Sequence, residues 1–511
     1  MPCSQSMAAK SLKEFSYQRH TPEKTLLYQV VKENLLTFLN LVETETGYPL
    51  PDFVIKEFDE YLKCGILANG FLRAKCESCS HELLVAFSCK KRGFCPSCGV
   101  RRMNESSIHL VDEVLPVKPI RQWVLSFPFQ LRLLLAIKPQ IMAKCLEITT
   151  KCITKYLIRK SGVKKSKAKT GAVTLIQRFG GSINLNVHFH QLFIDGVYEL
   201  DENNEPSTYH LVAQPSLAEL NTVLESIIQK VTKYLEKKKI IIKDNDQDLQ
   251  LEIPSEDSFS RLQKASVTYR FAMGKNKGKK ALTLKTVTET DHDSQKGLVV
   301  KNSGFSLHAG VSVKSHEREK LEKICRYIAR PPIAEERLSQ NEKGQIVYKL
   351  KTPWDDGTTH IYMSPLELLE KLASLIPRPK VHLTRFHGVL APHYKHRKII
   401  VPAPKVEPQV AEVVTPQTLA LDKLKEKNKK KRISWARLLK RIFNIDVEKC
   451  PHCGGKVKII AAIEDPKVIK KILEHLGLPS KPPNPLPARG PPVATENPTE
   501  FEYFQTSYNE F

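Results

Sequence analysis

Two histidines separated by one residue, His188 and His190, are the side chains best placed for metal chemistry. The surrounding segment reads as a β-strand, in which alternate side chains share a face, so Phe189 lies on the opposite face. Two imidazoles held on one face of a rigid strand can bind the same divalent cation. Chance also produces such a pair in a chain with 16 histidines, and two structural strand histidines are the alternative interpretation.

Cysteines are concentrated between residues 64 and 98, at spacings typical of zinc ligands. Cys76 and Cys79 form one Cys-x2-Cys turn, and Cys95 and Cys98 form a second. Two such turns predict one tetrahedral zinc site, because each turn supplies one edge of the tetrahedron. Further cysteines and a histidine are candidates to replace a ligand or to form a second site: Cys64, His81, Cys89, Cys450 and Cys453. The last two supply only half a zinc shell, so their assignment stays open.

The chain is strongly basic, with 80 Lys and Arg residues against 55 Asp and Glu residues, a formal net charge of +25. A surplus of this size favours a polyanionic partner, most often nucleic acid. Basic side chains flank the second cysteine turn and are candidates for contacts with DNA phosphates: Lys90, Lys91, Arg92, Arg101 and Arg102. The alternative is that they only provide a charged surface for a small metal-held module.

No apolar run approaches the roughly 18 residues that a transmembrane helix needs, and residues 1–15 lack the apolar core of a signal peptide. We therefore expect no membrane partner and an intracellular location. In a reducing compartment, the 12 cysteines are expected to hold metal more often than to form disulfides.

Two predicted elements position the candidate chemistry. Residues 171–200 read as two β-strands joined through Gly180 and Gly181, so the histidines lie on a hairpin, and Gln177 on its other strand can reach the same site. Gln is also common at exposed strand positions, which is the favoured interpretation of Gln177, so the third metal ligand stays open. Residues from Ser315, a candidate N-cap, to the stop at Pro331 read as a helix.

That helix carries Tyr327 near its C-terminal end. Position alone suggests a half-buried packing tyrosine, so its value depends on what lies opposite. Opposite a histidine-bound metal, Tyr327 could attack a DNA phosphorus and form a phosphotyrosine link, with the metal polarising a phosphate oxygen. Such a bond keeps the energy of the broken diester, so the strand can later be rejoined without ATP.

Several segments resemble, in the same order, the rolling-circle transposases of the insertion-sequence-ninety-one family, especially their common-region (ISCR) branch. They are CESCSHELLVAFSCKKRGFCPSCGVRRM, GAVTLIQRFGGSINLNVHFHQLFIDGVY, RYIARPPIAEERLS, TPWDDGTTHI, HLTRFHGVLAPH and CPHCGGKVKIIAAIEDP. The resemblance extends from about residue 25 to residue 480 and implies an HUH single-strand endonuclease. His188-Phe189-His190 matches its His-hydrophobe-His motif, Tyr327 its nucleophile position, and Cys76, Cys79, Cys95 and Cys98 its N-terminal zinc module.

The resemblance implies an α+β fold, in which a central antiparallel sheet carries the metal ligands and is flanked by helices. It also implies structural Zn²⁺, catalytic Mg²⁺ or Mn²⁺, and single-stranded or hairpin element ends as partners, in the cytoplasm of a bacterium at the nucleoid. One position departs from the two-tyrosine pattern, because Pro331 stands four residues after Tyr327. The chain therefore resembles the single-tyrosine branch, in which a released 3′ hydroxyl or Tyr327 itself must take the second step.

We expect five regions from composition and motifs: a helical segment and N-terminal zinc-binding domain (1–110), the HUH catalytic domain (111–400), a basic linker (401–432), a C-terminal Cys-x2-Cys unit (433–480) and a Pro-rich disordered tail (481–511). The function expected is a DNA transposase that nicks single-stranded DNA at element ends through a transient phosphotyrosine. A plasmid-type replication initiator or relaxase uses the same chemistry and is the nearest alternative. A non-catalytic, zinc-dependent DNA-binding protein is the alternative from another class.

Overall fold

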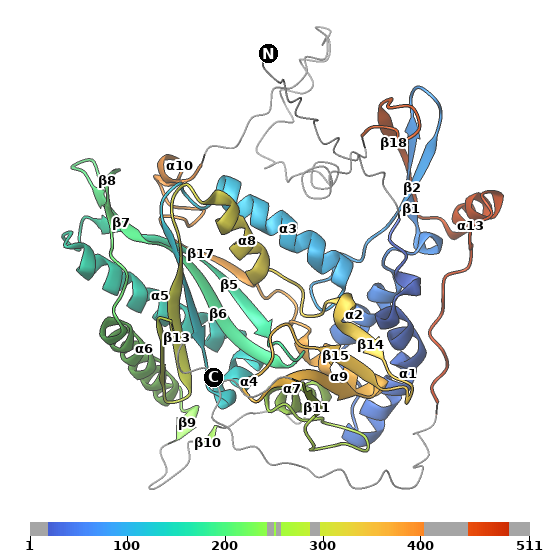
Figure 1. Ribbon diagram of the computed structural model, residues 1–511, viewed down its shortest axis with the longest axis horizontal. Helices are drawn as coiled ribbons and strands as arrows, with labels where there is room; N and C mark the ends of the chain where they lie inside the picture. The colour runs from blue at the N-terminus through green and yellow to red at the C-terminus, as the bar shows by residue number, and fades with distance from the viewer. Residues whose placement is uncertain (1–18, 243–249, 252–256, 287–296, 403–447, 490–511) are drawn as a thin grey trace, which may run out of the picture. The chain divides into compact units, whose positions relative to one another are not determined.

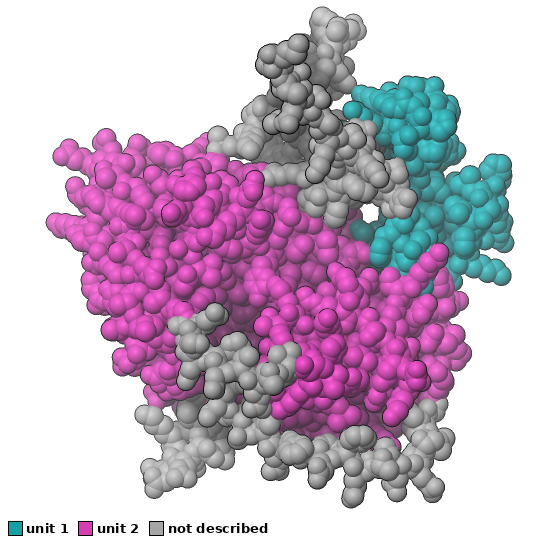
Figure 2. All heavy atoms as spheres, viewed as in Figure 1, with its two compact units in different colours: residues 1–23, 63–89, 405–482 teal, residues 24–62, 90–404, 483–511 magenta. Residues whose placement is uncertain are grey.

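The computed structural model describes residues 19–242, 250–251, 257–286, 297–402 and 448–489. The chain divides into two compact units, shown in separate colours in Figure 2. One unit combines residues 1–23, 63–89 and 405–482, and the other combines residues 24–62, 90–404 and 483–511. The chain contains both helices and sheets, and the named strands of these sheets pair antiparallel. This confirms the α+β class.

The larger unit is built on a six-stranded sheet (Figure 1). Its strands, in spatial order, are β12 (Val299–Asn302), β13 (Phe305–Val313), β3 (Ile120–Ser126), β6 (Leu185–Ile194), β5 (Gly171–Phe179) and β17 (Thr384–Gly388). The predicted hairpin is confirmed as β5–β6, and β6 is flanked by β3 and β5. The histidine pair therefore lies on an interior strand, where both edges have hydrogen-bonding neighbours.

The two faces of β6 are covered by different helices. Leu192 and Ile194, which share a face with the histidines, belong to a buried cluster that includes Val111 of α3 (Pro96–Glu113) and Leu321 of α8 (Arg318–Ile328). The opposite face packs toward α4 (Phe129–Ile137) and α5 (Pro139–Ser161), where Gln191 donates a 2.9 Å hydrogen bond to a threonine of α5. Helix α8 thus lies on the histidine face of the sheet.

Smaller elements complete this unit. The helices are α1 (Leu26–Thr46), α2 (Asp52–Lys63), α6 (Leu217–Lys237), α7 (Ser258–Val267), α9 (Pro365–Leu375) and α10 (Arg397–Ile400). A four-stranded sheet contains β11 (Leu282–Lys285), β16 (Thr358–Met363), β15 (Ile346–Lys349) and β14 (Leu338–Gln340). A three-stranded sheet contains β4 (Ala168–Lys169), β7 (Gly196–Leu200) and β8 (Pro206–Leu211), and a two-stranded one contains β9 (Ile241–Ile242) and β10 (Gln250–Leu251).

The predicted start of the tyrosine helix is wrong by two residues. The N-cap of α8 is Glu317, not Ser315. The Glu317 carboxylate accepts a 2.8 Å hydrogen bond from the Lys314 backbone N–H and so closes the preceding turn, which holds Ser315 outside the helix. The end of the helix agrees with the sequence, because Ile328 is its last residue and Pro331 cannot continue it.

The smaller unit joins distant parts of the chain in one three-stranded sheet. Its order is β18 (Val457–Ile463), β1 (Phe71–Cys76) and β2 (Glu82–Ala86), and α13 (Pro466–His475) covers Phe71 with two of its apolar residues. The structure therefore groups the C-terminal Cys-x2-Cys segment with residues 63–89, whereas the sequence treats it as separate. The basic linker, from residue 403 on, and the Pro-rich tail, from residue 490 on, lie outside the described residues. The start of the tail is described and not disordered as predicted, because the Leu486 N–H donates to the Lys32 carbonyl oxygen of α1 at 3.0 Å.

Within the described residues, no helix has the length and apolar character needed to cross a bilayer.

A buried ion pair ties three strands of the large sheet together. Arg121 of β3 donates to both carboxylate oxygens of Asp195, which follows β6, at 3.0 and 2.8 Å. Its remaining terminal nitrogen donates to the Ala309 carbonyl oxygen of β13 at 2.9 Å. Burial raises the pKa of Asp195 even though Arg121 opposes the shift. The guanidinium and carboxylate are 4% and 7% exposed, so each depends on the other for its charge.

We expect Asp195→Asn to lower the free energy of unfolding by about 3–5 kcal/mol, because the Arg121 charge stays buried without its partner. Urea unfolding followed by circular dichroism measures the change. Glu147→Gln is the matched control, since it breaks exposed pairs with Lys144 and Lys151 on α5 and should cost only about 0–1 kcal/mol. Equal losses of unfolding free energy in the two variants would show that the buried pair contributes no more to stability than the exposed pairs.

Candidate active site and metal centres

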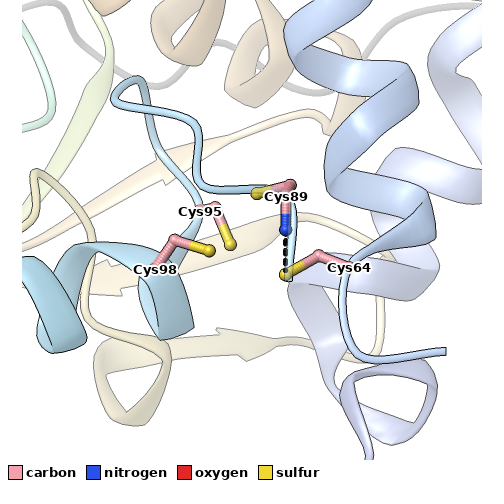
Figure 3. Close-up of side chains that lie close together, drawn as sticks. All are labelled: Cys64, Cys89, Cys95 and Cys98. Carbon is pink, nitrogen blue, oxygen red and sulfur yellow. Dashed lines mark hydrogen bonds between the residues drawn. The ribbon is translucent and has the colours of Figure 1, made fainter. Parts of the chain in front are cut away.

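Four cysteines gather around the start of α3. The sulfur atoms of Cys64, Cys89, Cys95 and Cys98 all lie within 4.8 Å of one another (Figure 3). Cys95 is the N-cap of α3, Pro96 occupies its first turn, and Cys98 follows one turn later. The Cys89 backbone N–H donates to the Cys64 sulfur at 3.3 Å, as it would to a thiolate. Four sulfurs at this separation fit one tetrahedral zinc.

A second group of four joins cysteines from opposite parts of the sequence. Cys76 and Cys79 meet Cys450 and Cys453, with sulfur–sulfur distances of 3.5 Å for Cys76–Cys453 and 3.6 Å for Cys79–Cys450. Zinc–sulfur bonds of about 2.3 Å require sulfurs about 3.8 Å apart in a tetrahedron, so the spacing suits a shared zinc and is far too long for disulfides.

Backbone donors surround this second group. The N–H groups of Ser78, His452 and Gly455 each donate to a cysteine sulfur at 3.4 Å. Gly455 allows the two turns to approach, because a Cβ there would lie 2.4 Å from the Ser78 hydroxyl oxygen. Donors aimed at sulfur stabilise the thiolate form, which is the form that binds metal.

The predicted zinc ligand set needs correction in its pairing. Cys76 and Cys79 do not join Cys95 and Cys98. They lie at the turn between β1 and β2, and the antiparallel β2 then carries the chain away from this turn, back past Phe71. The two cysteine turns consequently belong to different groups. Among the additional candidates, Cys64, Cys89, Cys450 and Cys453 complete the two sets. His81 belongs to neither, and its ring stacks at 5.9 Å on the ring of His452.

His190 is 5% exposed and His188 is partly buried, and the low pKa values of both imidazoles keep them neutral at pH 7. The His188 and His190 ring centroids are 4.8 Å apart, so the two imidazoles adjoin on one face as the alternation predicts. Burial lowers the pKa of His188 to about 4, reinforced by the charges of Arg132 and Arg330. Burial also holds the pKa of His190 well below its ordinary value, with smaller contributions from His188, Arg330 and His308. Neutral imidazoles are the form that binds a metal ion.

Hydrogen bonds to the ring nitrogens fit metal binding. His188 Nδ1 lies 2.9 Å from the Asn186 carbonyl oxygen, which can only accept, so Nδ1 carries the proton and Nε2 keeps its lone pair. His190 Nδ1 lies 2.7 Å from the Gln122 amide nitrogen, which donates to it; the alternative amide orientation, with the oxygen facing Nδ1, gives His190 the same tautomer as His188. The buried His190 Nε2 has no hydrogen-bond partner among the described residues, and in the tautomer protonated at Nδ1 its lone pair is available to coordinate a metal ion.

Gln177 connects the histidine row to the tyrosine helix. It pairs directly with His188 across β5 and β6, so both side chains share a face. Its amide nitrogen donates a 3.1 Å hydrogen bond to the carbonyl oxygen of Ile328, the last residue of α8. Because Gln177 is only 5% exposed, the alternative of a solvent-facing strand residue is wrong. Its amide oxygen stays a candidate for the third metal ligand.

Tyr327 lies half-exposed among cationic side chains. Its side chain is 44% exposed, the Arg330 guanidinium carbon lies 4.4 Å from its ring centroid, and the Lys351 ammonium lies 4.2 Å from it. Partial burial acts to raise the pKa of Tyr327. A hydrogen bond from Arg330 and the charges of Arg330, Lys351 and Arg337 outweigh it, so the pKa lies below its ordinary value. A lowered pKa favours the phenolate, which is the nucleophilic form.

Arg330 is a candidate functional residue that the sequence alone does not reveal. It contacts the Tyr327 ring, and its charge also depresses the pKa values of both histidines, so it lies near all three groups. One of its terminal nitrogens is buried without a partner among the described residues. The only sequence signal is its position three residues after Tyr327 in the segment predicted as helix, although α8 ends at Ile328 in the structure.

The five basic residues proposed from sequence as DNA contacts differ in their protein partners and in whether they line a cavity. Arg101 forms a 2.8 Å ion pair with Glu105, and Arg102 donates to the carbonyl oxygens of Lys90 and Lys91. Arg92 donates to the Val381 carbonyl oxygen at 3.1 Å. Lys91, Arg92 and Arg102 line a cavity next to α8, whereas Lys90 and Arg101 are not among its lining residues.

Comparison with protein families gives two matches. Residues 171–398 match a transposase family model, and residues 37–127 match the "Transposase zinc-binding domain" model of the insertion-sequence-ninety-one (IS91) transposases. The first range contains the histidines, Gln177 and Tyr327, and the second contains six of the eight clustered cysteines. Cys450 and Cys453 lie outside both ranges. Searches of the curated proteins and of the solved structures found no match.

We expect the purified chain to contain two zinc ions, one for each cysteine group. Substituting Cys450 and Cys453 together by serine should lower the content to one, as measured by atomic emission on folded protein. Cys145→Ala, which removes a buried cysteine outside both groups, should retain two. If the doubly substituted chain keeps its full zinc content, the grouping of Cys76 and Cys79 with Cys450 and Cys453 is incorrect.

Proposed function

The chain belongs to the insertion-sequence-ninety-one family of transposases, and from this premise we propose that it nicks single-stranded DNA at element ends through Tyr327. As a transposase it is a DNA-binding, nucleic-acid-processing enzyme. The finer proposal is an HUH endonuclease that becomes linked to the cut strand, drives rolling-circle transposition and works on bacterial DNA.

One observation carries this proposal: the C-terminal end of α8 is joined to the histidine row. The Gln177 side chain, paired with His188 on the sheet, donates to the carbonyl oxygen of the residue after Tyr327. The fold therefore brings a tyrosine and two neutral imidazoles to one face of the same sheet. Neither a packing tyrosine nor two structural histidines require this arrangement.

The covalent step follows from these groups. The Tyr327 phenolate oxygen attacks the scissile phosphorus and forms a phosphotyrosine bond, while the bond from phosphorus to the 3′ oxygen breaks and that oxygen takes up a proton. Arg330 and Lys351 favour the phenolate before attack. Arg330, which is close to both the tyrosine and the histidines, is also placed to offset the charge that develops on the phosphate.

His188 and His190 are the residues that would hold a divalent ion, and Gln177 is the candidate third ligand. When bound there, Mg²⁺ or Mn²⁺ supplies Lewis-acid polarisation of a phosphate oxygen. Both histidines are held neutral by burial, and both have an Nδ1 contact that orients the ring. These contacts serve the positioning role that supporting hydrogen bonds have in metal sites.

The two cysteine groups are proposed as structural zinc centres. All eight sulfurs are cysteine, which suits a closed tetrahedral site and leaves no position for a substrate. Zinc in the first group would set the start of α3, a helix that packs beside α8. Its proposed role is to position the catalytic elements, not to take part in the chemistry.

Tyr327→Phe should abolish the covalent protein–DNA adduct, because phenylalanine lacks the attacking oxygen. The measurement is a denaturing gel of the chain incubated with Mn²⁺ and a labelled single strand that carries the end of its own element. Tyr234→Phe, on α6 away from the histidine face, should form adduct normally. His188→Ala should lose the adduct and keep its circular dichroism spectrum.

Adduct formation by Tyr327→Phe at the parent rate would refute the nucleophile assignment. Absence of an adduct in the parent, with DNA binding intact, would favour the non-catalytic DNA-binding protein. A replication initiator or relaxase would form the same adduct on a plasmid origin strand, and the transposase assignment predicts preference for the element end.

Arg330→Gln should slow adduct formation at pH 7 by about tenfold or more, as expected for loss of a hydrogen bond to a charged group. The reactive form is the phenolate, so raising the pKa of Tyr327 should shift the rise of the pH–rate profile to higher pH. Arg330→Lys should restore part of the shift, since it keeps the charge. Arg326→Gln is the matched control, because Arg326 is paired with Glu322 on the same helix. A slower rate with an unmoved profile would mean that Arg330 acts only through packing.

A further inference from the structure

A basic cavity of about 260 Å³ lies next to the tyrosine helix. It is lined by the loop before α3, the first turns of α3, the end of β5, the end of α8 and residues 375–384. Five of its lining residues are basic: Lys91, Arg92, Arg102, Arg178 and Arg330. None of its lining residues is acidic, but the Glu57 carboxylate accepts a hydrogen bond from the N–H of the lining residue Gly93 and interacts with the charges of Lys91, Arg92 and Arg102.

Arg178 is the most unusual of these side chains. It is 5% exposed, and its Nε donates weakly to the Leu375 carbonyl oxygen at 3.4 Å. Its Nη2 has no hydrogen-bond partner among the described residues. Burial and the nearby positive charge of Arg378 lower the pKa of Arg178 to about 10, which still leaves it charged at neutral pH. An unpaired buried cation is costly unless an anion accompanies it.

Arg330 links this cavity to the nucleophile. It lines the cavity, contacts the Tyr327 ring at 4.4 Å, and has a buried terminal nitrogen without a partner within the described part of the chain. Its guanidinium also lies 5.6 Å from the ring centroid of Phe179, another lining residue. The cavity is thus bordered by two guanidinium groups that each have one buried terminal nitrogen without a partner among the described residues, and one of the two groups contacts the tyrosine ring.

The remaining wall is apolar and suits a small organic group attached to the anion. Ile176, Phe179, Pro331 and Pro332 contribute to it, and the volume is at the small end for ligand sites, which usually exceed about 300 Å³. Guanidinium groups bind phosphate oxygens bidentately, and aromatic or apolar walls accept a sugar or a base. A single nucleotide has both parts.

We propose that this cavity binds one phosphate-bearing nucleotide of the DNA strand, next to the phosphate that Tyr327 attacks, with Arg178 and Arg330 as its anion ligands. The identity of the strand rests on the proposed function, whereas binding of the phosphate does not. Arg178 acts here as a binding residue, since it does not contact the tyrosine. The cavity would hold the strand in place while the adjacent phosphodiester is cut.

The test uses the full chain carrying Tyr327→Phe, so that binding is measured without cleavage. Fluorescence anisotropy with a labelled oligothymidylate at several salt concentrations gives the affinity and its salt dependence. Adding Arg178→Gln should weaken binding about tenfold or more. It should also reduce the slope of log K against log salt by about 0.7, the value for one phosphate contact on a single strand. Arg159→Gln, an exposed arginine at the end of α5, should change both quantities far less.

Thermal denaturation keeps the result interpretable if the variant is perturbed. Without ligand, Arg178→Gln should melt at the same temperature as its parent or higher, because it removes an unpaired buried charge. Arg178→Lys should retain the salt slope and lose only part of the affinity, since it keeps the charge without the planar fork. A large drop in melting temperature together with an unchanged salt slope would assign Arg178 a structural role and overturn the proposal.

Separate arms distinguish the source of the phosphate. Thymidine monophosphate and inorganic phosphate are tested for protection in the same thermal assay. If they protect the parent but not Arg178→Gln, while oligothymidylate binding is equal in both, the cavity holds a free nucleotide or phosphate and the strand assignment is wrong. Equal weakening by Arg178→Gln and Arg159→Gln would likewise overturn it. Loss of the adduct by Tyr327→Phe is measured independently, so failure here leaves the nucleophile assignment standing.

Discussion

The alternation of side chains along β6 is the constraint on which the active-site geometry depends. His188, His190, Leu192 and Ile194 share one face, so the surface that presents the imidazoles continues directly into the surface that packs against α3 and α8. A register slip of one residue would turn the histidines to the opposite face. The turn between β5 and β6 opposes such a slip, because the Gly180 N–H donates to the Asn184 carbonyl oxygen at 2.9 Å.

Burial in this sheet leaves the histidines and the arginines in opposite protonation states. The imidazoles lose their protons, because the low dielectric penalises charge and neighbouring arginines add repulsion. Arginine keeps its proton even when buried, since the pKa of Arg178 on the neighbouring strand β5 stays near 10. The result is a neutral imidazole pair near the positive charges of Arg132 and Arg330. This combination of neutral imidazoles and positive charges suits an anionic phosphodiester that lies close to both.

Local sequence patterns predict the parts of this site that depend on neighbours in the chain. The Gly-Gly turn, the period-two alternation around Phe189 and the helix ending before Pro331 are each local, and each is present. The zinc ligand pairing could not be predicted in this way. Cys76 meets Cys453 because β18 pairs with β1, a contact between residues 377 positions apart that no spacing rule encodes.

Local sequence patterns also fail to predict which cationic residues are unpaired. Lys90 to Arg92 and Arg101 to Arg102 stand out in the sequence because they surround cysteines, yet Arg101 is paired with Glu105. Arg178 looks like an ordinary basic residue at the end of a strand, and only the packing of residue 375 and its neighbours against it reveals a buried, unpaired charge. The fold, and not the sequence pattern, thus distinguishes a solvated cation from one that needs an anion.

The position four residues after Tyr327 bears on how a second strand transfer occurs. Helix α8 ends at Ile328, so Pro331 is not on the next helical turn and does not share the face of Tyr327. Pro331 instead packs against α3, where a Cβ on Gly99 would lie 2.6 Å from the proline Cβ. A tyrosine substituted at 331 would therefore have to leave this contact before it could reach the site. Under the proposed mechanism, the second strand transfer would then use Tyr327 again, or the released 3′ hydroxyl would attack the phosphotyrosine bond directly.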